Sequence, residues 1–206
     1  MIKDLLTRRF ATKHFDPAKP VSAQDLNEIL DAARLSPSSF GIQAWQFFAI
    51  ANSDLKQKLA PACWGQPQIT EAPVVVILAA RTDLLGDDGV IKKFMAKSQK
   101  DQNRTAEQTA GYEKYITDAA SKLSAEETKV WSQKQVYLAG MTMMLAAMEK
   151  GIDSCPMEGF VPDQVSKILD LPAHIIPTLI IPLGYKNMEQ PVKTRFELAD
   201  VVKEIK

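Results

Sequence analysis

The stretch YLAGMTMMLAAM, residues 137–148, constrains the fold most, because it is apolar around the whole circumference of a helix. Ser124 followed by Glu127 forms a capping box, which predicts a helix from 125 to about 150, where Gly151 ends it. A surface helix is usually apolar on one side only, whereas a helix apolar on every side is normally enclosed. We therefore expect this helix at the centre of the protein or in an extensive dimer interface.

Alternating short helices and apolar strands occupy much of the remaining chain. Residues 2–9 are expected to form a short helix, and Ser22 with Asp25 is an acidic variant of the capping box that opens a helix over 23–35. Strands are expected at 45–51, 73–80, 152–155 and from 178, and a further helix at 162–170. The segment 73–80 is apolar at nearly every position, which indicates burial on both faces of a sheet.

Two segments do not fit a simple sheet with covering helices. Residues 88–122 are polar, and we interpret them as a solvated helical hairpin or a mobile loop rather than a ligand site. Near the end of the sequence, Leu198, Val201, Val202 and Ile205 recur at helical spacing. This apolar stripe requires a surface to cover.

Composition excludes several classes of function. A chain of 206 residues, 46% of them hydrophobic, is long enough for one well-buried core and short for two, so we expect a single domain over 1–206. Lysine plus arginine equals aspartate plus glutamate at 25 each, which gives no overall attraction to nucleic acid or to an anionic membrane. No run of about 18 apolar residues predicts a membrane span, and the first ten residues lack a secretory signal. We expect a cytoplasmic protein.

Familiar motifs of catalysis are missing from the sequence. His14 and His174 lie in no zinc-binding spacing, and Cys63 and Cys155 are interpreted as buried thiols, so we expect no metal site. The nine glycines form neither a dinucleotide-binding G-x-G-x-x-G nor a P-loop. No G-x-S-x-G elbow of a serine hydrolase occurs either.

Four short clusters carry the remaining polar chemistry: RRFATKHF at 8–15, PSSFGIQAW at 37–45, CPMEGF at 155–160 and VKTRF at 192–196. Each alone has an ordinary explanation as surface charge, a helix-stop turn, a hairpin or a polar tail. Together they offer two groups of cations, hydroxyls and backbone amides. Such a set suits a heterocycle that is rich in amides and carries a phosphate.

These clusters, in this order, resemble the FMN-dependent nitroreductases of the oxygen-insensitive type, a family that includes dihydropteridine and flavin reductases. The resemblance also covers EAPVVVILAA and KQVYLAG and is weakest over 88–122. It implies an α+β fold, with a mostly antiparallel central sheet flanked by helices, in an intertwined homodimer. Two FMN molecules would lie in the interface, and the segment from about 186 to 206 would cross to the partner.

The resemblance also implies roles for individual residues. Arg9, Lys193 and Arg195 would hold the FMN phosphate, and Lys13 would approach the N1 and O2 edge of the flavin. Glu158 and Gly159 would present backbone N–H groups to flavin N5 and O4, whereas Ser38 and Ser39 would reach the partner's flavin. The full expected cofactor site comprises Arg8, Arg9, Phe10, Ala11, Lys13, Pro37, Ser38, Ser39, Gly41, Gln66, Gln68, Pro156, Met157, Glu158, Gly159, Lys193 and Arg195.

Some assignments stay open. Either Gln66 or Gln68 would contact the pyrimidine edge of the flavin, and Gln68 stands where relatives have a lysine. Phe40, Trp64 and Tyr115 would line the substrate pocket, although ordinary burial explains each equally well.

The resemblance implies transfer of hydride from NADH or NADPH, through flavin N5, to nitroaromatics, quinones or related acceptors by a ping-pong mechanism. The alternatives are a flavin or dihydropteridine reductase, a dehalogenase-like flavin enzyme on the same fold and, remotely, a dimeric binding protein without enzymatic activity.

Overall fold

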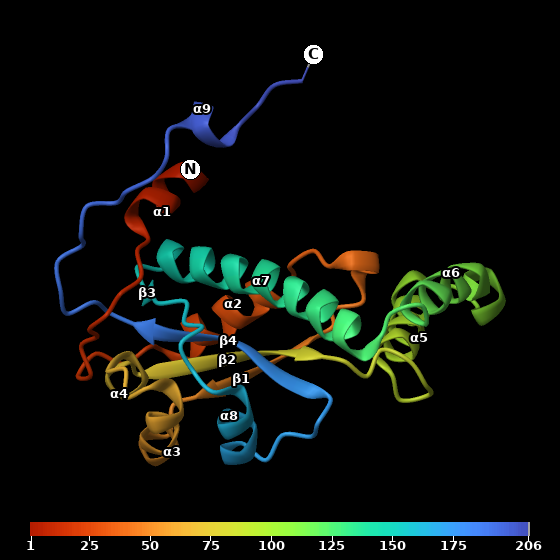
Figure 1. The fold of residues 1–206 in the computed structure, drawn as a ribbon, viewed down its shortest axis with the longest axis horizontal. Coiled ribbons are helices and arrows are strands. Elements are labelled where there is room, and N and C mark those ends of the chain that lie inside the picture. The colour runs from red at the N-terminus through yellow and green to blue at the C-terminus, as the bar shows by residue number, and fades with distance from the viewer. Residues whose placement is uncertain (206) are drawn as a thin grey trace.

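The computed structural model of the protein, shown in Figure 1, describes residues 1–205. Four strands form its sheet: β1 (Trp45–Ile50), β2 (Val74–Arg81), β3 (Asp153–Ser154) and β4 (Ile175–Gly184). The longer helices are α1 (Ile2–Arg8), α2 (Ala23–Arg34), α5 (Val90–Gln102), α6 (Ala106–Ala120) and α7 (Ala125–Glu149). The shorter ones are η1 (Ser39–Gly41), α3 (Ser53–Leu59), η2 (Pro61–Cys63), α4 (Gln68–Glu71), α8 (Pro162–Ile168) and α9 (Leu198–Val201).

The sheet has the order β1-β2-β4-β3, and each neighbouring pair is antiparallel. Seven of the eight residues of β2 are buried, which confirms that this strand is covered on both faces. Strand β4 begins at Ile175, three residues before the position that the sequence predicted. Pro177 interrupts the apolar pattern there, and the register shift of β2 between Leu78 and Ala79 lies opposite to it.

Helices cover the two faces of the sheet in separate layers (Figure 1). On one face, α2 and α7 pack on side chains such as Val76, Leu78 and Ile181. On the other face, residues of α3, η2, α4 and α8 pack on Val75, Ile77 and Ile180. Side chains alternate between the faces along each strand, so two apolar clusters with different partners form on one sheet. This arrangement confirms the expected α+β fold.

Helix α7 follows its predicted bounds to within one residue, and both reciprocal bonds of the capping box at Ser124 and Glu127 form. Ala139, Gly140 and Met143 are fully or nearly fully buried against the sheet. Tyr137 and Leu138 are 42% and 45% exposed, however, so one chain does not enclose the helix on every side. The expectation that the helix lies enclosed at the centre of a single chain is therefore wrong. The alternative, burial in a dimer interface, stays a prediction.

The polar segment 88–122 forms a helical hairpin, in which α5 and α6 pack against each other. A separate apolar cluster that includes Ile42, Leu84, Met95 and Ile116 joins the hairpin to the end of the sheet. The mobile-loop alternative is thus wrong, because enough apolar side chains face inward to hold both helices.

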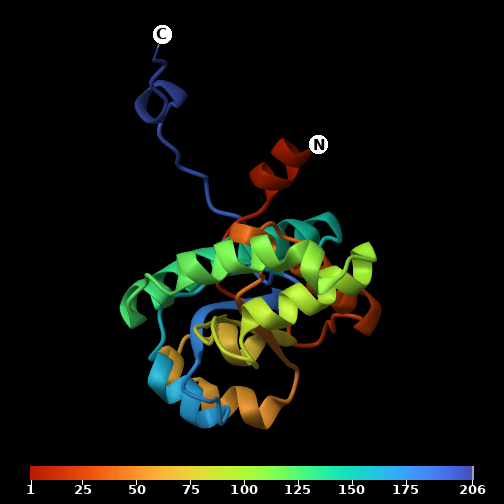
Figure 2. The same ribbon diagram turned by 90° about the vertical axis from the view of Figure 1, so that its right-hand side faces the viewer.

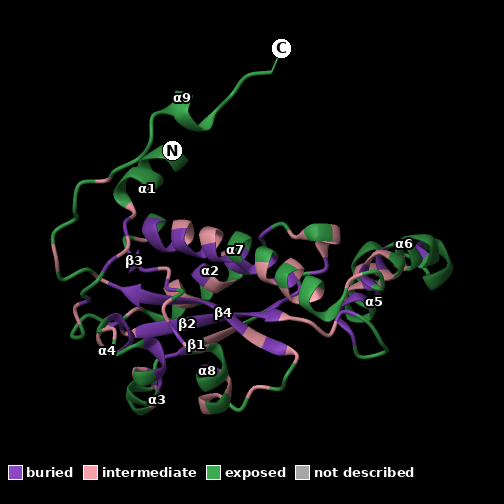
Figure 3. Cartoon of the chain, in the orientation of Figure 1, coloured by how far each residue is buried: buried purple, intermediate pink, exposed green. Residues whose placement is uncertain are grey.

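Helix α1 and the C-terminal segment project together from the body, as Figure 2 shows. Figure 3 shows that both are largely exposed. The spacing of the apolar stripe predicts a helix through 205, but only Leu198–Val201 are helical, and Leu198 and Ile205 are 74% and 96% exposed. So short a helix is unstable unless its apolar side is covered, and no other part of residues 1–205 covers it.

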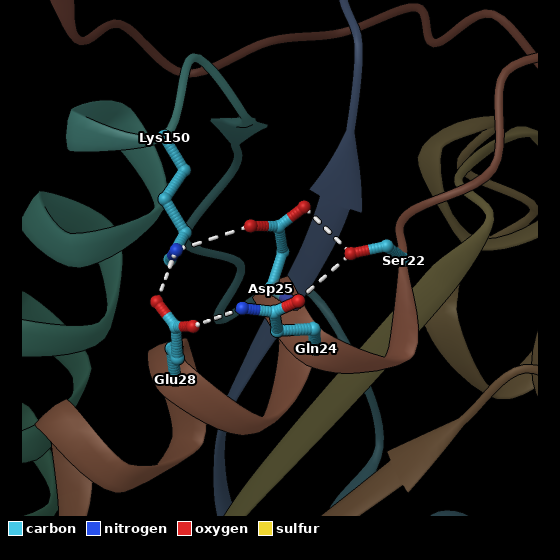
Figure 4. A network of polar contacts seen from close by, with 5 residues as sticks. All are labelled: Ser22, Gln24, Asp25, Glu28 and Lys150. Atoms are coloured by element: carbon cyan, nitrogen blue, oxygen red, sulfur yellow. Dashed lines mark hydrogen bonds and ion pairs between the residues drawn. The ribbon is translucent and has the colours of Figure 1, made fainter.

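An ion-pair network joins the end of α7 to the start of α2 (Figure 4). Lys150 Nζ donates to Asp25 Oδ1 at 3.0 Å and to a carboxylate oxygen of Glu28. Hydrogen bonds from Ser22 and then Lys150 lower the pKa of Asp25, whereas Lys150 is the main cause of the lowered pKa of Glu28. The cation stands at a helix C-terminus and the carboxylates at a helix N-terminus, so both helix dipoles favour the arrangement.

Replacing Lys150 with methionine is expected to lower the melting temperature at neutral pH by more than the same change at Lys122, which forms no ion pair within residues 1–205. Carboxyl groups with a lowered pKa stabilise the fold above about pH 4 and lose this contribution as the pH falls through their folded-state values. The difference between Lys150→Met and the native protein should therefore vanish in acid. Thermal melts from pH 3 to 8 would check this, and an unchanged difference at pH 3 would contradict it.

Candidate functional site

Three cations from opposite ends of the sequence meet where α1 ends. Arg9 follows α1, and Lys193 Nζ donates to its carbonyl oxygen at 2.5 Å and also to that of Leu6. Arg195 lies close enough that its charge acts on both Arg9 and Lys193. Within residues 1–205, none of the three side chains forms an ion pair with a carboxylate. This cationic cluster, Arg9 with Lys193 and Arg195, therefore carries uncompensated positive charge.

The electrostatics of the cationic cluster favour an added anion. The pKa of Arg9 is lowered by burial and then by the charge of Arg195. Burial also lowers the pKa of Lys193, and the charges of Arg9 and Arg195 lower it further. Like charges held together without a counter-ion repel one another, so a phosphate placed among them would relieve that repulsion. Arg8 differs, because its guanidinium pairs with Asp4 at 3.0 Å.

A three-residue turn after β3 presents free backbone donors. Met157 still pairs with Ile180 of β4, and the N–H of Phe160 closes the turn onto the carbonyl of Glu158 at 2.9 Å. The N–H groups of Glu158 and Gly159 have no acceptor among the described residues. We call Glu158 and Gly159 with these two free amides the donor turn. Two adjacent unpaired N–H groups form a ready site for a ligand acceptor.

Residues of η2 and of the loop between η2 and α4 support the donor turn from one side. Gln66 Nε2 donates to the Gly159 carbonyl at 2.8 Å, and Val161 donates its N–H to Ala62 at 2.8 Å. A Cβ at Gly159 would lie 2.8 Å from Gln66 Nε2 and 2.9 Å from the Trp64 ring, so any larger residue there would displace these two side chains. Trp64 is 68% exposed. Its backbone adopts the left-handed conformation, with φ 57°. Such conformations are strained in residues other than glycine and cluster at functional sites.

Lys13 lies beside Cys155, in the segment that leads from β3 to the donor turn. Its Nζ is 3.6 Å from Sγ of Cys155, a buried free thiol. Gln68 is also buried, with its Nε2 3.9 Å from the same sulfur. Gln66 is thus engaged with Gly159, whereas Gln68 lies near Cys155 and Lys13.

One side of α7 connects the two parts of this site. Its Tyr137 hydroxyl donates to Glu158 Oε1 at 2.7 Å, and Sδ of Met144 lies 3.8 Å from Nη1 of Arg9. Seven residues separate these contacts, which is about 10 Å along a helix. The donor turn and the cationic cluster are therefore spaced so that a ring and a phosphate joined by a ribityl chain could reach both.

The serine-containing loop lies on a different side of α7. The N–H of Ser39 donates to Gln135 Oε1 at 2.8 Å, and the Tyr112 hydroxyl of α6 donates to the Phe40 carbonyl at 3.1 Å. Residues two apart on a helix point in nearly opposite directions, so Gln135 and Tyr137 do not hold their partners at one place. Phe40 packs edge-on against Tyr115, with ring centroids 5.8 Å apart.

The structure therefore divides the predicted site residues into two sets within one chain. It brings together Arg9, Lys13, the donor turn, Gln66, Gln68, Trp64, Lys193 and Arg195, with Phe10, Ala11, Pro156 and Met157 in the same segments. It places Pro37, Ser38, Ser39, Phe40, Gly41 and Tyr115 apart from them, at the helical hairpin. The supporting residues Tyr137, Met144 and Gln135 were not found by sequence reasoning, because on a helix that is apolar nearly throughout no local signal distinguishes them.

Other features of the molecule do not suggest a competing site. A hollow of about 820 Å³ lies between the start of α7 and α8 and contains none of the predicted residues. Within residues 1–205, no group of three or more His, Cys, Asp or Glu side chains is arranged to bind a metal ion. None of the described helices combines the length and apolar character that a bilayer crossing requires.

Comparison with known proteins gives consistent matches. The model of the nitroreductase family matches residues 6–185. A Staphylococcus haemolyticus protein provisionally named an NAD(P)H nitroreductase is 37% identical over 201 residues, covering 94% of this chain and 92% of its own. A Staphylococcus epidermidis structure provisionally named an NAD(P)H:FMN oxidoreductase has a TM-score of 0.91 at 22% identity, covering 100% of this chain and 96% of its own. The structure of an Exiguobacterium sibiricum protein provisionally named a nitroreductase, in complex with FMN, has a TM-score of 0.87 at 20% identity, covering 100% of this chain and 97% of its own.

Proposed function

Because this chain belongs to the nitroreductase family, a family of oxidoreductases, we propose that it binds FMN and passes hydride from NADH or NADPH to nitroaromatics, quinones or related acceptors. The observation that carries the proposal is the cationic cluster, three positive side chains without a carboxylate partner in residues 1–205. The matched relatives support it, since one is described as an NAD(P)H:FMN oxidoreductase and another is in complex with FMN.

The residues present fit FMN at both of its ends. The guanidinium forks of Arg9 and Arg195 and the ammonium of Lys193 suit a phosphate, which accepts several charge-assisted hydrogen bonds. The free amides of the donor turn suit the acceptor atoms of the ring, and Lys13 adds a positive charge next to Cys155, in the segment that leads to the turn. Bound FMN supplies hydride acceptance and donation at its N5.

The protein's own contribution is then to bind FMN and to orient the substrates against it. No side chain is assigned as an acid or base in the reaction, and Glu158 takes part through its backbone N–H. We propose that NAD(P)H and the acceptor occupy the same space in turn, which gives a ping-pong mechanism. Trp64 is the proposed wall of that space in this chain, because its ring is exposed beside the donor turn.

We also propose a homodimer, in which the exposed side of α7 and the C-terminal segment meet a second copy. The apolar side chains of Leu198, Val201 and Ile205 are exposed in one chain and would be covered by the partner. The loop that contains Ser38 and Ser39 lies apart from the donor turn of its own chain. This separation supports the expectation that both serines contact the partner's flavin.

The test is a visible spectrum of the freshly purified protein, followed by reduction with NADH and NADPH under anaerobic conditions. Flavin absorbance that bleaches with a nicotinamide and returns with a nitrofuran or quinone is expected. Initial rates should give parallel double-reciprocal lines. Rapid turnover only with free FMN would favour a flavin reductase, and colourless protein that does not bind added FMN would overturn the proposal.

A further inference from the structure

The carboxylate of Glu158 is held by a single contact. Its Oε1 accepts the Tyr137 hydroxyl at 2.7 Å, and no cation pairs with it in the described part of the chain. The donor comes from α7, whereas the acceptor lies in the donor turn, so this bond joins two elements that are 21 residues apart in sequence. Glu158 is exposed, and an exposed glutamate without a partner would be free to change rotamer.

A mobile carboxylate at this position would be an acceptor beside two unpaired donors. The free N–H groups belong to Glu158 itself and to the next residue, Gly159. Carboxylates form strong, charge-assisted hydrogen bonds with backbone N–H groups. An unrestrained Glu158 would therefore compete with any ligand for the donor turn.

We propose that Tyr137 is a positioning residue, whose hydroxyl holds the Glu158 carboxylate in place and so keeps the two amides of the donor turn available to the flavin ring. This inference rests on the proposed function and adds a specific residue to it. It assigns a role to the Tyr137 side chain that is different from packing, although the residue lies in the apolar stretch of α7.

The backbone of the donor turn does not depend on Tyr137. Gln66 holds the Gly159 carbonyl, Val161 is bonded to Ala62, and Met157 is paired with Ile180. Loss of the tyrosine hydroxyl should thus release the carboxylate and leave the turn itself intact. Burial, followed by the contact with Glu158, raises the pKa of Tyr137 to about 12, so the hydroxyl keeps its proton and stays a donor at every working pH.

The experiment is a double-mutant cycle with Tyr137→Phe and Glu158→Ala, each stripped of flavin. FMN affinity is measured by quenching of flavin fluorescence, and the midpoint potential of the bound flavin is measured separately. Tyr137→Phe is expected to raise the dissociation constant of FMN about three- to tenfold, the worth of one hydrogen bond, and to make the midpoint potential more negative. In the Glu158→Ala background, the same change should alter neither quantity, because no carboxylate remains to be released.

Tyr185→Phe is the matched control, because its hydroxyl forms no hydrogen bond in the described residues and its ring lies under Lys19 instead. It should bind FMN as the native protein does. If Tyr137→Phe leaves both quantities unchanged, or shifts them equally with and without Glu158, the positioning role is wrong although the native protein binds FMN. Native protein that binds no FMN would overturn the proposed function as well.

Discussion

Replacing Arg195 with alanine is expected to weaken FMN binding by about 1.5–3 kcal/mol, or roughly 10- to 150-fold in the dissociation constant. The reason is that Arg195 belongs to a cluster of three cations with no carboxylate partner in residues 1–205, and a charge-assisted bond to phosphate would be lost. Its charge lowers the pKa of both Arg9 and Lys193, so the ligand-free protein gains from its removal. The melting temperature without FMN should therefore not fall, whereas the rise on adding FMN should shrink.

Riboflavin, which lacks the phosphate, makes this test specific. The native protein should prefer FMN to riboflavin, and Arg195→Ala should lose much of that preference without changing its affinity for riboflavin. Lys203→Ala removes a cation from the same C-terminal segment and serves as the control, with FMN binding expected to match the native protein. Fluorescence titrations of the flavin-free proteins measure all of these constants. An Arg195→Ala protein that still prefers FMN to the native extent would contradict the phosphate assignment.

Replacing Gly140 with valine is expected to lower the free energy of unfolding by about 1–3 kcal/mol. This glycine lies where α7 crosses the sheet, and a Cβ there would be 2.6 Å from Cδ2 of Leu179. Leu179 is only 2% exposed, and Leu78 and Ile181 stand 3.7 Å and 3.5 Å from the same point, so the leucine has little space in which to move. The substitution must push the helix away from the sheet or force side chains out of their rotamers.

Gly111 is the control for the loss of stability at Gly140, because it also lies within a helix, α6. A Cβ at Gly111 would meet nothing within 4 Å, and the residue is exposed on α6. Gly111→Val should change the stability by no more than about 0.5 kcal/mol, as is usual for surface substitutions. Urea unfolding of the three proteins gives the comparison. Valine has a slightly higher helix propensity than glycine, so propensity predicts no loss at either position. Equal losses at both positions would contradict the explanation by the close approach to Leu179.

Most of the longer elements could be predicted because their signals are local. The capping box at Ser124 and the glycine at 151 located α7 to within one residue, and the apolar run of β2 indicated its burial correctly. Residues 52–72 were not assigned, since α3 and α4 have only seven and four residues and carry no sustained periodicity. The length of the C-terminal helix was overestimated, because the spacing of apolar residues does not indicate whether a surface is present to stabilise the helix.

The candidate site was less predictable from local signals than the helices and strands were. The resemblance named Arg9, Lys193, Arg195 and the donor turn, but residue types alone supported only ordinary surface explanations for each. The contacts of Tyr137 with Glu158 and of Gln66 with Gly159 had no counterpart in the pattern of the sequence. They join segments that are 21 and 93 residues apart, beyond the reach of any rule based on near neighbours.

The sequence by itself determined where α2 and α7 begin and end, which strand is buried on both faces, and the family to which the chain belongs. These properties depend on capping, apolar periodicity and the order of short motifs, all of which can be read along the chain. Only the tertiary structure decided that, within residues 1–205, three cations meet without a carboxylate partner and two amides of one turn have no acceptor, and that a tyrosine hydroxyl contacts the carboxylate beside them. Charge repulsion and hydrogen-bond competition depend on distances through space, which the packing of α7 on the sheet sets.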